Sequence, residues 1–526
     1  MSFPGDQYLQ TSQNRLIHDE LRFDRRSLSE EHDNHLNDLN SEQRHVYDTV
    51  MNAVHSNKGG VFFVYGYGGT GKTFVWKTLS ASLRSKGEIV LNVASSGIAS
   101  LLLPGGRIAH SSFAIPFNPN EESTCNIKQG SPLAELIEKS KLIIWDEAPM
   151  MHKSCFEALD KSMRDIMRFV NSSSLHLPFG GKTVVFGGDF RQILLIIPRG
   201  SRQDIVLTTI NSSYIWRHCT VLRLTKNMRP QTLGSDEECA KTKQFSDWIA
   251  NIGDGKIGEQ NDGYATIDIP DDLLLKYCDD PITSIVESTF PSLDISICIT
   301  AYFQQRAILA PTFDVVQSIN EYIISINHYE GRLYLSSDTT CHSDKSFGLL
   351  HDVHTPEYLN GIKCSGVPNH ELNLKVGTLV MLLRNIDHSL GLCNGTRLIV
   401  TRLENHVLEG QILSGSNAGH KVLIPRMSLT PSDPRLLFKF EIKQYHLIVQ
   451  YHLIVSYAII INKSQGQSLS HVGLFLKNLV FSHGQLYVAV SRVTNPKGFK
   501  ILICDGKTNQ KNSTTNVVFK EVFQNF

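Results

Sequence analysis

A glycine-rich segment between a strand-like run and a helix-like stretch constrains the fold of this chain more than any other feature. Residues 66–73 read GYGGTGKT, follow the apolar run VFFVYG from Val61 and precede an amphipathic stretch that begins near Phe74. This is the G-x-x-x-x-G-K-[ST] pattern of a phosphate-binding loop in the strand–loop–helix setting that it requires. It predicts an α/β fold with a nucleotide phosphate at the helix start, because backbone N–H groups and the helix dipole favour an anion there.

The residues of this loop have distinct expected roles. Lys72 is expected to contact the β- and γ-phosphates of ATP, and the Thr73 hydroxyl is expected to bind Mg²⁺. The other candidates are expected to bind the phosphates through their backbone N–H groups. They are Gly66, Gly68, Gly69, Thr70 and Gly71.

An acidic pair, Asp146 and Glu147, ends the apolar run that begins at Lys141. A pair at the carboxyl end of a strand lies beside the phosphate loop in folds of this kind. We expect Asp146 to hold Mg²⁺ through water, and Glu147 to orient and deprotonate the attacking water. Such a pair alone is often a surface turn, and the loop upstream is what favours the catalytic interpretation.

Short β-type runs alternate with helical stretches in two series, which is typical of parallel sheets flanked by helices. The first series is VFFVYG from Val61, EIVLNVAS from Glu88, KLIIWDE from Lys141, KTVVFGGD from Lys182 and TVLRL from Thr220. The second series is AILAP from Ala307, LIVSYAIII from Leu453, VGLFL from Val472, LYVAVSR from Leu486 and KILIC from Lys500. We therefore expect an α/β protein with two parallel-sheet domains.

We place the domain boundaries where the pattern of strands, helices and turn residues changes along the chain. Residues 340–440 contain short strands joined by Asn-Gly and Gly turns, which predicts a small β-barrel inserted into the second α/β domain. We expect the other segments to be a disordered tail at 1–37, a first domain at 38–229, a linker and helical segment at 230–305, and a second domain at 306–339 and 441–526.

Composition limits the partners. The chain has 51 Lys plus Arg and 51 Asp plus Glu, so any nucleic-acid site has to be a local groove. Ten cysteines without a C-x-x-C pair argue against a zinc ribbon or a disulfide scaffold. No apolar stretch reaches the ~18 uninterrupted residues of a membrane span, and no secretory signal is evident. We expect no membrane partner and a nuclear location, with the mitochondrion as the alternative.

Seven further segments follow in a recognisable order. They are LNSEQ from Leu39, ASSGIA from Ala94, HSSF from His110, GGDFRQ from Gly187, NMR from Asn227, NKSQGQ from Asn462 and YVAVSR from Tyr487. With the phosphate loop and the acidic pair, they make residues 39–505 resemble the Pif-type (petite integration frequency) DNA helicases of superfamily one, most closely the branch related to Helitron transposon helicases. The resemblance implies two RecA-like domains around ATP and an SH3-like barrel.

The resemblance assigns further roles at the nucleotide. Gln43 would read the adenine edge, Gln192 would sense the γ-phosphate, and Arg229 would contact a phosphate. Arg492 would be an arginine finger from the second domain, so that hydrolysis depends on closure of the two domains. Gly466 completes the implied nucleotide set.

The resemblance also implies a path for single-stranded DNA. The implied contacts are Ser95, Ser96, His110, Ser111, Phe113, Lys463, Ser464 and Gln465. Phe113 is the candidate platform on which a base would stack, although an isolated phenylalanine is more often part of a core. Further candidates in the barrel are Arg384, Asn394 and Arg397. The implied partners are single-stranded DNA and forked or 5′-tailed duplex DNA, bound by a monomeric motor.

The expected function is an ATP-dependent DNA helicase that moves 5′-to-3′ and serves DNA repair, recombination or telomere maintenance. Three positions depart from the family pattern: Leu195 replaces a proline, Phe313 an asparagine and Ile460 a threonine. In addition, QYHLIV occurs twice in tandem at 444–455, which would lengthen one strand by ~20 Å or form a bulge or loop. These departures motivate an alternative, a transposon-derived ATP- and DNA-binding protein that no longer unwinds.

Overall fold

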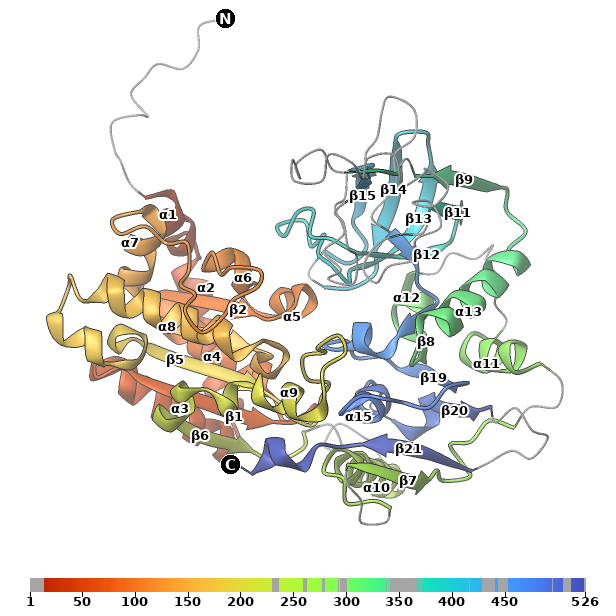
Figure 1. Cartoon of the computed structure of the whole chain (residues 1–526), viewed down its shortest axis with the longest axis horizontal. Helices are drawn as coiled ribbons and strands as arrows, with labels where there is room; N and C mark the ends of the chain where they lie inside the picture. The colour runs from red at the N-terminus through yellow and green to blue at the C-terminus, as the bar shows by residue number, and fades with distance from the viewer. Residues whose placement is uncertain are drawn as a thin grey trace, which may run out of the picture.

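The protein consists of two α/β lobes and a small β-domain, seen in the computed structural model of Figure 1. The structure describes residues 14–228, 236–258, 263–276, 280–291, 293, 300–336, 338–340, 368, 370–415, 417–427, 440–442, 453–493, 495–504 and 512–524. Within these ranges no helix is both long and apolar enough to cross a membrane.

The first lobe is built on a six-stranded parallel sheet of order β3-β2-β4-β5-β1-β6. Its strands are β1 (Gly60–Gly66), β2 (Ile89–Ala94), β3 (Arg107–Ile108), β4 (Ser140–Asp146), β5 (Thr183–Gly188) and β6 (Cys219–Leu224). All five strands of the first predicted series are confirmed. The inner strands are apolar on both faces, as expected of a parallel sheet covered by helices.

Helices cover both faces of this sheet, and each face has its own apolar core. One face carries α3 (Ser41–His55) and α4 (Lys72–Arg84), and the other carries α7 (Pro132–Lys139) and α8 (Lys153–Met167). The remaining helices of the lobe are short: α5 (Gly97–Leu101), α6 (Ala109–Ser112), α9 (Arg202–Leu207), η2 (Ala148–Met150), η3 (Ser172–His176), η4 (Pro178–Gly181), η5 (Ile210–Ser212) and η6 (Tyr214–His218).

The expected disordered tail is helical where the structure describes it. Residues from Arg15 to Leu21 form α1, and residues from Arg25 to Asp38 form α2, which packs beside α4. The prediction of a tail over 1–37 is therefore wrong from residue 15 onward.

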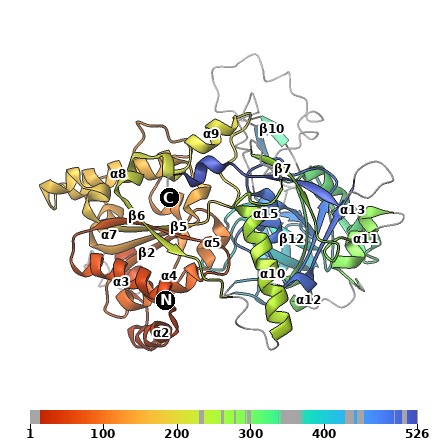
Figure 2. The same cartoon turned by 90° about the horizontal axis from the view of Figure 1, so that it is seen from below.

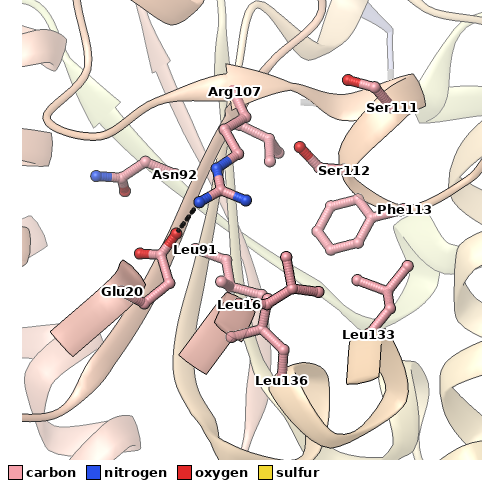
Figure 3. Close-up of a pocket in the computed structure, with 11 residues that line it drawn as sticks. Leu16, Glu20, Leu91, Asn92, Arg107, Ser111, Ser112, Phe113, Leu133 and Leu136 are labelled. Atoms are coloured by element: carbon pink, nitrogen blue, oxygen red, sulfur yellow. Dashed lines mark ion pairs between the residues drawn. The ribbon is translucent and has the colours of Figure 1, made fainter. Parts of the chain in front are cut away.

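A buried ion pair explains the order of α1. The Glu20 carboxylate lies 3.2 Å from Arg84 Nη2 and 3.0 Å from Arg107 Nη2, and Glu20 and Arg84 are both buried. Glu20 and Leu16 line a cavity of about 330 Å³ together with Phe113, Leu133 and Leu136 (Figure 3). These partners are distant in sequence, so the local composition of α1 could not reveal them.

The second lobe has a four-stranded parallel sheet of order β18-β8-β19-β20. Its strands are β8 (Arg306–Ala310), β18 (Ala458–Ile460), β19 (His471–Leu476) and β20 (Phe499–Ile503). Its helices are α10 (Asp236–Gly253), α11 (Pro281–Thr289), α12 (Thr300–Gln304), α13 (Phe313–Ile326) and α15 (Gln485–Val490), with η8 (Ile461–Ser464) and η9 (Pro496–Gly498). The last described helix, η10 (Lys520–Phe523), packs in the first-lobe core instead. The run LYVAVSR, which we expected to be a strand, is α15 and the turn that follows it. A short apolar run buried on all sides does not distinguish a strand from a helix.

The segment expected to be a linker, residues 230–305, belongs instead to the second lobe. Helix α10 packs against α15, as Figure 2 shows. Strand β7 (Tyr264–Asp268) pairs in antiparallel fashion with β21 (Ser513–Val517). Both pairings involve residues far along the chain, so the local sequence of this segment does not reveal them.

The inserted β-domain is present, with wider boundaries than the expected 340–440. A five-stranded antiparallel sheet has the order β15-β14-β13-β12-β17. Its strands are β12 (Leu379–Leu382), β13 (Arg397–Leu403), β14 (Val407–Ile412), β15 (Lys421–Pro425) and β17 (Leu453–Val455); β9 (Gly331–Leu335) pairs with β11 (Glu371–Lys375), and β10 (Asp338–Thr340) with β16 (Phe440–Ile442). Tyr334 of β9 and Leu453 of β17 share its apolar core, so both strands belong to it. The SH3-like closure of this domain stays a prediction.

The tandem QYHLIV repeat is only partly described. The second copy supplies β17, while the first copy lies outside the described residues.

Candidate functional site

The phosphate loop has the backbone geometry that its glycines predict. It connects the end of β1 to the start of α4, and Gly69 and Gly71 have left-handed φ values of 98° and 82°. No side chain caps the N-terminus of α4, which leaves that helix end available to an anion. Lys72 Nζ donates to the carbonyl oxygen of Gly66. The loop can therefore hold a phosphate chain as expected.

Gln43 braces this loop from α3. Its Nε2 donates to Thr70 O over 3.0 Å, and its Oε1 accepts from the Asn40 backbone N–H over 3.1 Å. The side chain is only 2% exposed, and a Cβ atom on Gly71 would lie 2.3 Å from its Nε2. The adenine-reading role of Gln43 stays a prediction, because its amide is engaged with the protein here.

The segment that follows β6 supports the loop from the other side. Tyr67 Oη donates to Thr225 O over 2.6 Å, and Met228 N donates to Gly69 O over 2.9 Å. Arg229, which the sequence assigns to a phosphate contact, lies outside the described residues.

The acidic pair lies beside the loop, at the carboxyl end of β4. Asp146 is buried, and its pKa is raised by burial against the opposing Lys72 charge. Burial raises the pKa of Glu147 to about 7; the Asp146 charge acts in the same direction, and Lys72 and Arg492 act to lower it. Glu147 has a left-handed φ of 53°, a strained conformation typical of active sites.

The residues here fit a magnesium ion. Asp146 Oδ1 is buried and makes no hydrogen bond within the described part of the chain. A buried carboxylate oxygen of this kind suits a hard cation, and Thr73 is the second residue of α4, directly after the loop. Among the described residues, no group of three or more His, Cys, Asp or Glu side chains could hold a metal alone. Mg²⁺ needs no such group, because it uses one or two carboxylates together with substrate phosphates.

Arg492 comes from the second lobe and lies near this carboxylate pair. Its side chain is 6% exposed, so it does not face bulk solvent. Nε donates to Val488 O over 2.9 Å, and Nη1 donates to Ser464 O and Gln467 O over 3.2 and 3.0 Å. Its charge acts on the Glu147 carboxyl. The role of Arg492 as an arginine finger that completes the site around Lys72 stays a prediction.

The GGDFRQ loop (residues 187–192) is the main contact between the lobes at this site. Gln192 Oε1 accepts from Gln465 Nε2 over 3.4 Å. Asp189 Oδ2 accepts from Tyr487 Oη over 2.6 Å. Asp189 and Tyr487 carry roles that the sequence reasoning did not assign; the only signal was their presence inside two segments of the resemblance.

Several of the expected DNA contacts gather around one loop of the β-domain. Lys463 Nζ donates to Asn394 Oδ1 over 3.3 Å. A Cβ atom on Gly97, next to Ser96, would lie 3.1 Å from Asn394 O. Ser95 is half-buried and its Oγ accepts from the Trp145 indole over 3.1 Å. The segments that carry Ser96 and Lys463 therefore both meet the β-domain at Asn394.

Phe113 is not a stacking platform. It is 1% exposed and packs in the first-lobe core, with its ring stacked 6.0 Å from that of Trp145. Phe117, four residues further on, is 93% exposed and stacks on His110 at 6.4 Å. Ser111 is also exposed. Nothing local in the sequence HSSFAIPF indicates which phenylalanine is the buried one.

Other expected site residues are placed differently as well. Ser464 is buried and its hydroxyl donates to Ile461 O, and Gln465 is buried against Gln192. Gly466 lies beside Ile98 of α5 rather than the phosphate loop, so its nucleotide contact stays a prediction.

Arg397, a candidate for binding DNA in the β-domain, is buried. Its Nη2 donates to the carbonyl oxygens of Arg306 and Ser456 over 3.0 and 3.3 Å. Burial lowers its pKa to about 10. Arg397 therefore fastens the β-domain to the second lobe, and the expectation of a DNA contact is wrong in this structure.

Comparisons with known proteins bear on the same regions. The family described as "PIF1-like helicase" matches residues 38–263, and the "DNA helicase Pif1, 2B domain" matches residues 357–403. The "ATP-dependent DNA helicase PIF1" of Danio rerio is 26% identical over 485 residues, covering 90% of this chain and 63% of the relative. The "ATP-dependent DNA helicase Pif1" of Campylobacter jejuni is 24% identical over 467 residues, covering 84% of this chain and 88% of the relative.

Solved structures agree on the fold. A structure titled "Structural Basis for DNA Unwinding at Forked dsDNA by two coordinating Pif1 helicases" has a TM-score of 0.58 at 23% identity, covering 88% of this chain and 91% of that one. The "Pif1 helicase from Candida albicans" has a TM-score of 0.58 at 21% identity, covering 92% and 98%. These likenesses confirm the expected α/β fold with two RecA-like lobes.

Proposed function

The chain belongs to the PIF1-like helicase family, and we propose that it is an ATP-dependent DNA helicase that moves 5′-to-3′ along single-stranded DNA and unwinds duplex. One observation carries the proposal. The GGDFRQ loop of the first lobe is bonded to the second-lobe segments that hold Arg492, because Tyr487 Oη donates to Asp189 Oδ2 over 2.6 Å and Gln465 Nε2 donates to Gln192 Oε1 over 3.4 Å. A site completed by both lobes makes hydrolysis depend on how the lobes sit together. The chain spans 63% of the length of the Danio rerio relative.

The chain's own residues support hydrolysis of ATP. The phosphate loop and Lys72 hold the phosphates, and the Glu147 carboxylate orients the attacking water and accepts its proton. Arg492 stabilises the charge that develops on the γ-phosphoryl group. Asp146 and Thr73 would hold Mg²⁺, which supplies charge neutralisation at the phosphates.

Coupling to DNA follows from the contacts between the lobes. The GGDFRQ loop connects the nucleotide site to Gln465, two residues from Lys463, which meets the β-domain at Asn394. A shift of the lobes on ATP turnover would therefore move the Lys463 segment and the β-domain at Asn394, and with them a bound strand.

The proposed partners are single-stranded DNA and forked or 5′-tailed duplex. One structural neighbour is titled "Bacteroides Pif1 bound to ssDNA", with a TM-score of 0.56. We propose that a monomer translocates, in the nucleus or the mitochondrion, in DNA repair, recombination or telomere maintenance. Membership in the Helitron-related branch also stays a prediction.

A steady-state ATPase assay with a polarity-defined unwinding readout tests the function. The full chain should hydrolyse ATP faster when single-stranded DNA is added, and it should open 5′-tailed but not 3′-tailed duplexes. Lys72→Ala should abolish both activities, while Lys77→Ala on the same helix should retain them.

Each outcome is informative. Absence of ATP turnover from a folded chain would disprove the proposal. Turnover and DNA binding without strand separation would favour the alternative of a chain that no longer unwinds, and Ile460→Thr would then be the variant to examine for recovery.

A further inference from the structure

We propose that Tyr487 is a positioning residue for ATP hydrolysis, because its hydrogen bond to Asp189 fixes the Arg492 segment of the second lobe against the GGDFRQ loop of the first. The inference rests on the proposed function. It assigns a role to a contact between the lobes rather than to a group that touches ATP.

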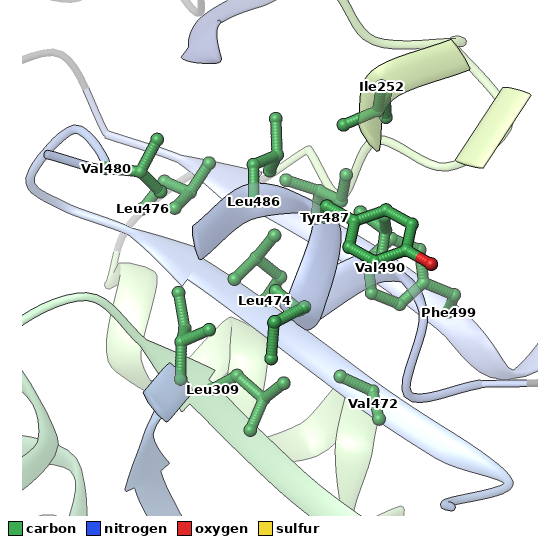
Figure 4. Close-up of a cluster of buried hydrophobic side chains, with 14 of the residues drawn as sticks. Ile252, Leu309, Val472, Leu474, Leu476, Val480, Leu486, Tyr487, Val490 and Phe499 are labelled. Carbon is green, nitrogen blue, oxygen red and sulfur yellow. The ribbon is translucent and has the colours of Figure 1, made fainter. Parts of the chain in front are cut away.

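The Tyr487 side chain is held in a single position. It is 2% exposed, and Figure 4 shows its ring projecting from α15 near Ile252, Val490 and Phe499. A Cβ atom on Gly253 would lie 2.7 Å from the ring, so α10 closes tightly over it. The hydroxyl reaches out of this apolar cluster to Asp189 Oδ2 at 2.6 Å.

Asp189 needs this donor. The residue is 1% exposed, and its other carboxylate oxygen accepts from the Arg191 backbone N–H over 3.1 Å. A buried carboxylate is stable only when its oxygens have donors. Burial, and then the Asp189 charge, raise the pKa of Tyr487 well above its usual value, so the phenol keeps its proton and remains the donor.

Two further contacts hold the start of α15 in the second lobe against the GGDFRQ loop. His483 Nε2 donates to Phe190 O over 2.7 Å. A Cβ atom on Gly484 would lie 2.3 Å from Arg191 O, so the start of α15 lies directly on the loop backbone. These contacts anchor the start of the helix, whereas Tyr487 anchors it further along, toward Arg492.

Arg492 moves with this helix. Its Nε donates to the carbonyl oxygen of Val488, the residue next to Tyr487. Asp189 and Arg492 also act on the Glu147 carboxyl. The Asp189 charge raises the pKa of Glu147, and the Arg492 charge lowers it. A loss of the Tyr487–Asp189 bond therefore loosens the Arg492 segment from the GGDFRQ loop, while the Lys72–Gly66 and Gln43–Thr70 bonds of the phosphate loop do not involve Tyr487.

The test compares the wild-type chain, Tyr487→Phe and a matched control, Tyr457→Phe. Tyr457 is equally buried and donates to Gly377 O over 3.1 Å, away from the site. At saturating single-stranded DNA, Tyr487→Phe should lower kcat about tenfold, equivalent to ~1.4 kcal/mol. Its affinity for MgADP should stay within about twofold, while its affinity for MgADP with aluminium fluoride should fall about tenfold. Tyr457→Phe should leave all three unchanged.

Asp189→Asn provides a second variant if Tyr487→Phe proves poorly folded by thermal melting. It removes the charged acceptor and should slow kcat, and the double variant should be no slower than the slower single variant, because both remove one interaction.

Two outcomes would overturn the inference alone: an active wild-type chain whose Tyr487→Phe variant keeps its kcat, or a Tyr457→Phe control that slows equally. A folded wild-type chain without any ATP turnover would instead overturn the proposed function and the inference together.

Discussion

Asn211 Nδ2 donates a hydrogen bond of 2.8 Å to the carbonyl oxygen of Val522, so a residue that follows the last strand of the second lobe lies inside the first lobe. Val522 is fully buried in the first-lobe core, and Glu521 forms a 2.7 Å ion pair with Arg202. Figures 1 and 2 both show this segment crossing from β21 to the first lobe. It ties the two lobes together next to the GGDFRQ loop, since Phe519 N donates to His483 Nδ1 and His483 Nε2 donates to Phe190 O.

Replacing Val522 should destabilise the first lobe. Val522→Asp would bury an unpaired charge in its core and should lower the free energy of unfolding by about 3 kcal/mol. Urea unfolding measures this, with Val170→Asp as the control, since Val170 is exposed. Equal unfolding midpoints for the two variants would show that the crossing segment is not part of the lobe.

The pH dependence of ATP turnover should follow the ionisation of the Glu147 carboxyl. Its carboxyl must be ionised to accept a proton from water, and its pKa is raised to about 7. The kcat/KM for ATP should therefore rise with pH through about 7 and level off above it. Glu147→Gln should lower kcat at least ~100-fold while MgATP still binds. Glu135→Gln, on helix α7, should alter neither property, and a flat profile for the wild-type chain would contradict the assignment.

The ion pair under α1 should contribute strongly to stability. Glu20→Ala leaves Arg84 buried without its carboxylate partner and should cost ~3–5 kcal/mol of unfolding free energy. Asp19→Ala removes only exposed pairs, 3.9 and 4.0 Å long, and should cost less than ~1 kcal/mol. Differential scanning calorimetry compares the two. The same melting temperature for both variants would mean that α1 is not docked in solution.

Substitutions of the two phenylalanines near His110 should have different effects, one on stability and the other on DNA binding. Phe113→Ala creates a core cavity and should cost ~3–5 kcal/mol of stability. Phe117→Ala should change stability by less than ~0.5 kcal/mol and weaken binding of single-stranded DNA by ~1–3 kcal/mol, the range for one stacked base. Fluorescence anisotropy with a labelled oligonucleotide measures the second effect. Unchanged affinity in Phe117→Ala would remove this side chain from the DNA path.

The sequence predicts those features of the structure that depend only on residues adjacent in the chain. The phosphate loop could be predicted because left-handed glycines, a preceding apolar strand and a following helix are all adjacent in sequence. The first-lobe strands could be predicted because a parallel sheet covered on both faces requires continuous apolar runs. The spacing of residues alone does not predict that Arg492 acts at the site that contains Lys72. That prediction came from the order of the segments in the family resemblance.

By itself, then, the sequence determined the nucleotide chemistry and the two-lobed α/β class. Only the tertiary structure decided that LYVAVSR forms a helix, that Phe113 is core while Phe117 is exposed, that Glu20 holds α1 against Arg84, and that Tyr487 meets Asp189. The physical reason is common to all four. Burial and partner choice are properties of surfaces brought together from distant parts of the chain, and an apolar or charged residue carries no local mark of which surface will cover it.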